Sequence, residues 1–128
     1  MRVDDVGRIV RASTLRYFAP GEVILDPSSG RAEHCYVIRQ GGVGGERPNA
    51  GTNAAPLWEL SAGEMFPLGA LLGQRAVTSV YRAKQDTFCL VFPAAVFDDL
   101  ISRSHVFQDF CTRRLAHLLD LLRASLQA

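Results

Sequence analysis

The sequence predicts a mainly β domain with some α structure: an antiparallel β-roll, of the jelly-roll or double-stranded β-helix type, followed by C-terminal helices. Two observations carry this prediction. Short β-like runs recur at about ten-residue intervals between turn signals, over residues 14–92. After Pro93 the apolar residues change to helical spacing, which continues to residue 127. We therefore expect one domain over residues 1–128, with about eight strands in the β-roll (14–92) and C-terminal helices over 93–127.

The composition is that of a single globular domain. The 128 residues include 48 % hydrophobic and 21 % charged residues, and the formal net charge is +1. This balance lacks the basic footprint of a nucleic-acid-binding protein, and no apolar run approaches the roughly 18 residues of a membrane span. The N-terminus lacks the apolar stretch of a signal peptide. We expect a cytoplasmic protein that contacts neither nucleic acid nor membrane.

The strand-rich part begins after a short helix expected over residues 2–13. Runs rich in β-branched and aromatic residues, separated by Pro-Gly, Gly-Gly and similar breakers, mark the strands. These runs cover residues 15–18, 22–25, 35–39, 57–60, 78–83 and 87–90. The polar, glycine-rich stretch 44–55 is expected to be the longest loop.

Two helices are expected after the strands. Pro93 suits the first turn of a helix, because its missing N–H is not needed there. Ser104 is the predicted N-cap of a longer helix over residues 105–127. The apolar residues of that helix, from Phe107 to Leu126, cover an arc of roughly 180°, whereas one packing surface needs about 100°. This width predicts a homodimer through the last helix or contact with a following domain; the alternative is an arc packed between the β-roll and the first helix.

Three stretches of the sequence resemble the cyclic-nucleotide-binding domains. They are residues 16–25 (RYFAPGEVIL), 35–43 (CYVIRQGGV) and 57–66 (LWELSAGEMF), which occur in the order found in that family. The resemblance extends over about residues 14–125. It implies a non-enzymatic regulatory domain whose ligand is cyclic AMP or another nucleotide.

Residues 66–78 (FPLGALLGQRAVT) resemble the phosphate-binding cassette of these domains. In the family, the N-terminus of a short helix and an arginine bind the cyclic phosphate, and a glutamate accepts a hydrogen bond from the ribose 2′-hydroxyl. Here we expect the short helix at residues 69–72. The resemblance implies ligand contacts from Gly69, Ala70, Leu71, Arg75, Ala76 and Thr78.

The cassette departs from the family pattern at three positions. Leu68 stands at the position of the ribose-binding glutamate, and Pro67 replaces a glycine, which removes a backbone donor. An ungapped alignment places Val77 at the position of the arginine. Arg75 takes that position if the loop is two residues shorter than usual.

A narrower resemblance comes from FPLGALL (66–72), YRA (81–83), DTFC (86–89) and FQDFCTRRLAHLL (107–119). These stretches are similar to the N-terminal domain of bacterial signalling proteins that continue with CBS domains and a nucleotidyltransferase domain. The resemblance implies that the chain is the first domain of such a protein.

The sequence offers little for catalysis or metal binding. Serine-hydrolase, zinc-protease and P-loop motifs are missing, and the three cysteines are too few and too far apart for a disulfide framework. His34 and Cys35 are adjacent on a predicted strand and so point to opposite faces. Asp98 and Asp99 are expected on a solvated helix face. Two functions remain: a ligand sensor that signals through its C-terminal helices, or a module without a small ligand that serves dimerisation or docking.

Overall fold

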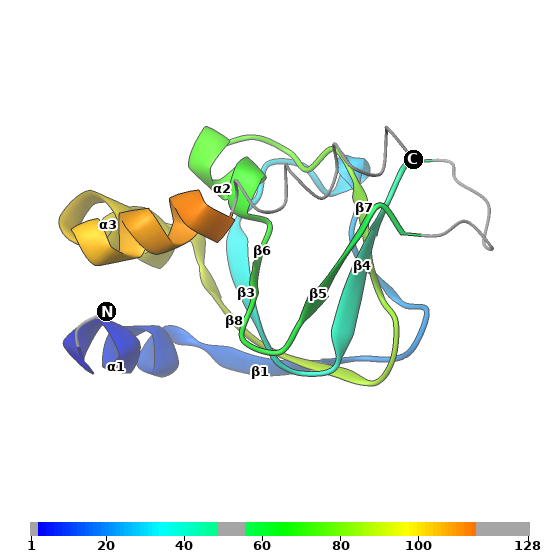
Figure 1. Ribbon diagram of the computed structural model, residues 1–128, viewed down its shortest axis with the longest axis horizontal. Coiled ribbons are helices and arrows are strands. Elements are labelled where there is room, and N and C mark those ends of the chain that lie inside the picture. The colour runs from blue at the N-terminus through cyan, green and yellow to red at the C-terminus, as the bar shows by residue number, and fades with distance from the viewer. Residues whose placement is uncertain (1–2, 49–55, 115–128) are drawn as a thin grey trace.

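The fold is a β-roll of two four-stranded antiparallel sheets with helices packed at one end (Figure 1). The structure is a computed structural model that describes residues 3–48 and 56–114. Sheet A has the order β1 (Thr14–Phe18), β8 (Thr87–Pro93), β3 (His34–Gln40), β6 (Met65–Phe66). Sheet B has the order β2 (Val23–Leu25), β7 (Val80–Ala83), β4 (Gly42–Glu46), β5 (Trp58–Ser61). The antiparallel eight-stranded roll confirms the predicted fold class.

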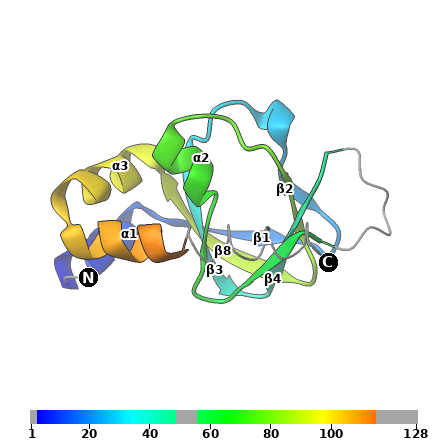
Figure 2. The same cartoon turned by 45° about the horizontal axis from the view of Figure 1, so that its top comes forward.

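Helices and turns connect these sheets. Helix α1 (Val3–Ala12) precedes β1, the 3₁₀ turn η1 (Pro27–Ser29) precedes β3, and α2 (Leu68–Gly73) lies between β6 and β7. Helix α3 (Ala94–Arg103) follows β8 directly, and residues 105–114 form a further helix. Both views place α1 and α3 together beside sheet A (Figure 2). Within the described residues, no helix is long and apolar enough to cross a membrane.

Strand alternation divides the apolar residues between two cores. On β3, Tyr36 and Ile38 face sheet B, whereas Cys35 faces the helices and His34 is exposed. The roll core, between the sheets, consists of Phe18, Tyr36, Ile38, Val43, Leu60, Phe66, Ala83, Cys89 and Val91. The helix-side core consists of Ile9, Cys35, Met65, Leu68, Leu71, Phe92, Phe97, Leu100, Phe107 and Cys111. The helices therefore pack against one face of sheet A, and sheet B packs against the other.

The expected loop over residues 44–55 is wrong at its beginning, because Gly44 and Gly45 belong to β4 and pair with both β5 and β7. Glycine weakens strands, so its presence misled the sequence prediction. Glycine stands at position 45 because the strand has no space for a side chain there: a Cβ added at Gly45 would lie 2.1 Å from Trp58 Cε2. The strand prediction missed the two-residue strand β6. It also began β7 at Thr78, which lies in the loop before that strand.

Ser104 separates α3 from the helix at residues 105–114. Its backbone is extended (φ −121°, ψ 110°), and its hydroxyl accepts a hydrogen bond from the Phe107 N–H at 3.2 Å. This confirms the predicted N-cap. Phe107 and Cys111 are fully buried in the helix-side core. Phe110 of the expected arc is half-buried against the same core, and the remaining residues of the arc, from Leu115 to Leu126, lie outside the described residues.

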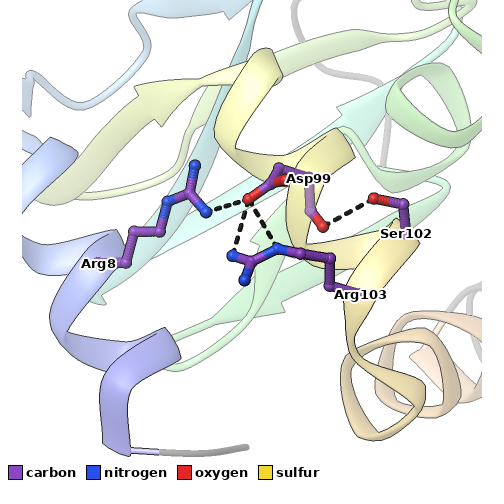
Figure 3. Close-up of polar contacts among 4 residues, drawn as sticks. All are labelled: Arg8, Asp99, Ser102 and Arg103. Carbon is purple, nitrogen blue, oxygen red and sulfur yellow. Dashed lines mark hydrogen bonds and ion pairs between the residues drawn. The ribbon is translucent and has the colours of Figure 1, made fainter.

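The expectation for Asp98 and Asp99 is only half right. Asp98 is exposed, but Asp99 forms ion pairs with Arg8 of α1 and Arg103 of α3, the latter at 2.8 Å (Figure 3). The contact with Arg8 spans ninety-one positions of sequence, so local periodicity contains no sign of it. Asp99 therefore joins the first helix to the third.

Candidate ligand-binding site

The cassette segment leaves β6, forms α2 and returns to β7 through a short loop. Pro67 precedes the helix, and Gln74 ends it in the left-handed conformation (φ 52°), with its N–H directed to the carbonyls of Ala70 and Leu71. The Arg75 N–H donates to the Ala70 carbonyl at 3.0 Å and closes the turn. The short helix expected at residues 69–72 is thus present, one residue longer at each end.

The six residues proposed as ligand contacts do not share one exposed surface. Ala70 and Leu71 are 4 % and 3 % exposed and pack inward. Gly69 and Ala76 are half-buried, and Arg75 and Thr78 are exposed. Arg75 and Thr78 therefore provide the accessible side chains of the set, while the others contribute backbone and packing.

Leu68 occupies the position of the family glutamate and packs into the helix-side core. Its side chain is 2 % exposed and lies in the helix-side core with Leu71 of the same helix and Phe97 of α3. It is not a member of the roll core. Leu68 is therefore a packing residue that anchors α2 to α3, and it offers no polar group to a ribose.

Arg75 folds back over the end of α2. Its Nη1 donates to the Ala76 carbonyl at 3.1 Å, and a Cβ added at Gly73 would lie 3.2 Å from its Nε. Burial raises the pKa of Tyr81 to about 12, and the positive charge of Arg75 acts in the opposite direction.

A second arginine meets the cassette from the loop before β3. Arg31 Nη2 donates to Gln74 Oε1 at 3.2 Å, and Arg31 forms an antiparallel bridge with Ala76. The Ala32 N–H also donates to the Arg75 carbonyl at 3.1 Å. Sequence reasoning missed Arg31, because no local pattern signals a contact between segments more than forty residues apart.

Aromatic side chains fill the space between the two sheets. Tyr36 stacks on Phe66 with ring centroids 4.9 Å apart, and Phe66 stacks on Tyr81 at 5.3 Å. Trp58 meets Tyr81 edge-on at 4.9 Å. Such stacked and edge-on pairs stabilise the core beyond their buried area. The interior beside the cassette is therefore packed with side chains.

A small cavity remains where β2 and β3 separate. Its volume is about 90 Å³, below the roughly 300–1,000 Å³ of typical small-molecule pockets. It is lined by Leu25, Ser29, Gly30, Arg31, Ala32, Glu33, His34, Tyr36 and Val77. Val77, the alternative position for the family arginine, contributes an apolar wall, and the guanidinium at this cavity belongs to Arg31.

A sequence profile of the cyclic nucleotide-binding domain matches residues 15–104. The chain belongs to this family. Solved structures similar to it include a CooA mutant from Carboxydothermus hydrogenoformans (16 % identity, TM-score 0.76), the cAMP-bound PfPKA-R (14 %, 0.78) and the catabolite activator protein of Thermus thermophilus (24 %, 0.68).

These three structures match nearly all of this chain, 98 %, 97 % and 99 %, in that order. The matches span 79 %, 41 % and 58 % of the respective structures. At these identities the likeness establishes a common fold. A sequence comparison with curated proteins found no match.

Proposed function

We propose that the domain is a non-enzymatic regulatory module that binds a nucleotide, cyclic AMP or another, and signals through its C-terminal helices. The observation that carries the proposal is the helix-side core. Leu68 and Leu71 of α2 share this core with Phe97 and Leu100 of α3 and with Phe107 of the next helix. Because protein interiors are closely packed, a displacement of the cassette helix must be accommodated by the helices it touches.

The proposed contact residues are Gly69, Ala70, Leu71, Arg75, Ala76 and Thr78. Arg75 supplies the positive charge for the phosphate, and the hydroxyl of Thr78 can donate to it. Leu68 offers nothing to a ribose, so recognition depends mainly on the phosphate.

The output element is the helix that begins after Ser104. Its first turn is fixed by the Ser104 cap, and Arg114 forms an ion pair with Glu64, in the β5–β6 turn, at 3.6 Å. Arg114 is exposed and Glu64 is half-buried, and a pair this open to solvent contributes only about 0–1 kcal/mol. Its modest strength suits a contact that is made in one state and released in the other.

The sequences of the cassette and of the last helix resemble those of bacterial CBS-domain nucleotidyltransferase proteins. This resemblance supports a wider proposal. In that setting the chain is the cytoplasmic first domain, and ligand occupancy controls the activity of the domains C-terminal to it. The last helix would contact either a second copy, as a homodimer, or the next domain of the same chain.

A second function, a docking module without a small ligand, is favoured by one observation. The aromatic stack of Tyr36, Phe66 and Tyr81 fills the roll interior. In that case the domain would keep the fold for dimerisation or docking only.

Calorimetry with cyclic AMP, cyclic GMP and AMP distinguishes the two functions. The sensor predicts binding of at least one nucleotide below millimolar concentration, weakened about tenfold or more by Arg75→Ala. Arg39→Ala, an exposed arginine on β3, is the matched control and should leave affinity unchanged. If none of the three binds at millimolar concentration, the sensor function is wrong.

A further inference from the structure

Helix α2 ends at Gln74 in a backbone conformation that glutamine rarely adopts. Its φ of 52° and ψ of 49° are left-handed, and within residues 3–48 and 56–114 every other positive φ belongs to a glycine. Glycine is the usual residue at such a helix end, because it has no Cβ to oppose this conformation. Glutamine is therefore unfavourable here for the backbone, and a contact of its side chain must offset that cost.

The side chain of Gln74 contacts Arg31, in the loop before β3. Gln74 Oε1 accepts a hydrogen bond from Arg31 Nη2 at 3.2 Å, across forty-three positions of sequence. Both residues are exposed, so this bond adds little to the stability of the whole domain. It acts locally, because it ties the end of the cassette helix to a segment outside the cassette.

Backbone contacts hold the two residues after Gln74 between the same two segments. The Arg75 N–H donates to the Ala70 carbonyl of α2 at 3.0 Å, and the Arg75 carbonyl accepts from the Ala32 N–H at 3.1 Å. Ala76 forms the antiparallel bridge with Arg31. The backbone that carries the Arg75 side chain is thus fixed to α2 on one side and to the loop before β3 on the other.

We infer that Gln74 and Arg31 are positioning residues of the proposed nucleotide site, whose hydrogen bond holds the cassette loop in the conformation from which Arg75 reaches the phosphate. The inference rests on the proposed function. A binding group that is already held in place loses less conformational entropy when its ligand arrives. Loss of the Gln74–Arg31 bond should therefore weaken nucleotide binding without unfolding the domain.

Calorimetry with cyclic AMP, cyclic GMP and AMP, together with melting curves, tests this inference. Gln74→Met keeps the length of the side chain, removes the acceptor and should weaken binding about three- to tenfold. Gln74→Gly should weaken binding similarly, yet melt at the wild-type temperature or above, because glycine suits the left-handed conformation. A purely structural role would not lower affinity while keeping stability. Gln85→Met, at an exposed glutamine between β7 and β8, is the matched control and should bind as the wild type does.

A double-mutant cycle with Arg31→Ala distinguishes positioning from direct contact with the ligand. Arg31→Ala alone should weaken binding about three- to tenfold. In the Gln74→Met background it should weaken binding less than about twofold further, because the two side chains act through one hydrogen bond. An effect of Arg31→Ala that is equally large in both backgrounds would show that Arg31 acts independently of Gln74, and would overturn the inference.

The remaining outcomes separate this inference from the proposed function. If a nucleotide binds and depends on Arg75, but Gln74→Met and Gln74→Gly bind it as tightly as the wild type, the inference is wrong and the proposed function stands. If the wild type binds no nucleotide at millimolar concentration, the proposed function fails and the positioning role fails with it.

Discussion

Replacing Leu68 by glutamate restores the carboxylate of the family cassette, yet we expect it to destabilise the domain and to create no ribose contact. The Leu68 side chain is 2 % exposed and packs against Leu71 and Phe97 in the helix-side core. Truncating a buried leucine to alanine costs about 2–5 kcal/mol, and burying an unpaired carboxylate adds to that cost. The loss therefore reaches at least about 3 kcal/mol, a large share of the ~5–15 kcal/mol that holds a domain together.

Urea unfolding followed by the fluorescence of Trp58 measures this loss. Leu72→Glu is the matched control, because Leu72 lies on the same helix and is 38 % exposed; it should change the free energy of unfolding by less than about 0.5 kcal/mol. For Leu68→Glu the loss should be smaller at pH 4 than at pH 7, because burial raises the pKa of a carboxyl group and favours its neutral form. A Leu68→Glu variant as stable as the wild type, with higher affinity for cyclic AMP, would refute the assignment of Leu68 to the core.

Further predictions concern the strand glycines, the helix ion pairs and the thiols. Gly45→Ala should lower the free energy of unfolding by about 1–3 kcal/mol, because the new Cβ would lie 2.1 Å from Trp58 Cε2. A melting curve measures this loss, and a curve identical to that of the wild type would contradict the close contact between Gly45 and the indole of Trp58. Asp99 has a lowered pKa, through the hydrogen bond from Arg103 and then the charges of Arg103 and Arg8, so its contribution to stability is present above about pH 4 and lost below it. In Asp99→Asn the free energy of unfolding should therefore fall less steeply as the pH drops below about 4. Asp98→Asn should leave this pH dependence unchanged. Burial raises the pKa of Cys89 to about 11 and that of Cys111 to about 12, so iodoacetamide at pH 8 should label these thiols only after urea is added; rapid labelling of the native protein would contradict their burial.

The fold was predictable because its signals are local. Breakers at short intervals mark the strands, and the change of period after Pro93 marks the helices. Ser104 could be identified as a cap because its side chain bonds to the backbone only three residues further along, at Phe107. Helix α2 was expected from the resemblance of the cassette, and its length was almost correct.

The features that the sequence could not supply depend on contacts between distant segments. Gly45 favours a loop by its type, yet it lies in a strand because Trp58 needs the space of its missing side chain. The side chain of Leu68 points toward the helices because of the way α2 packs in the fold, and the neighbours of Leu68 in the sequence do not determine this direction. Arg31 reaches the cassette only because the loop before β3 is bridged to Ala76.

Coupling between the cassette and the last helix is tested most directly by hydrogen exchange with and without bound nucleotide. With AMP present at saturating concentration, we predict altered protection at residues 68–77 and, in the same samples, around Ser104 and through residues 105–114. The shared core of Leu71 and Phe107 is the physical reason that both should respond. A bound nucleotide that changes exchange at residues 68–77 and leaves residues 104–114 unaffected would contradict signalling through the C-terminal helices.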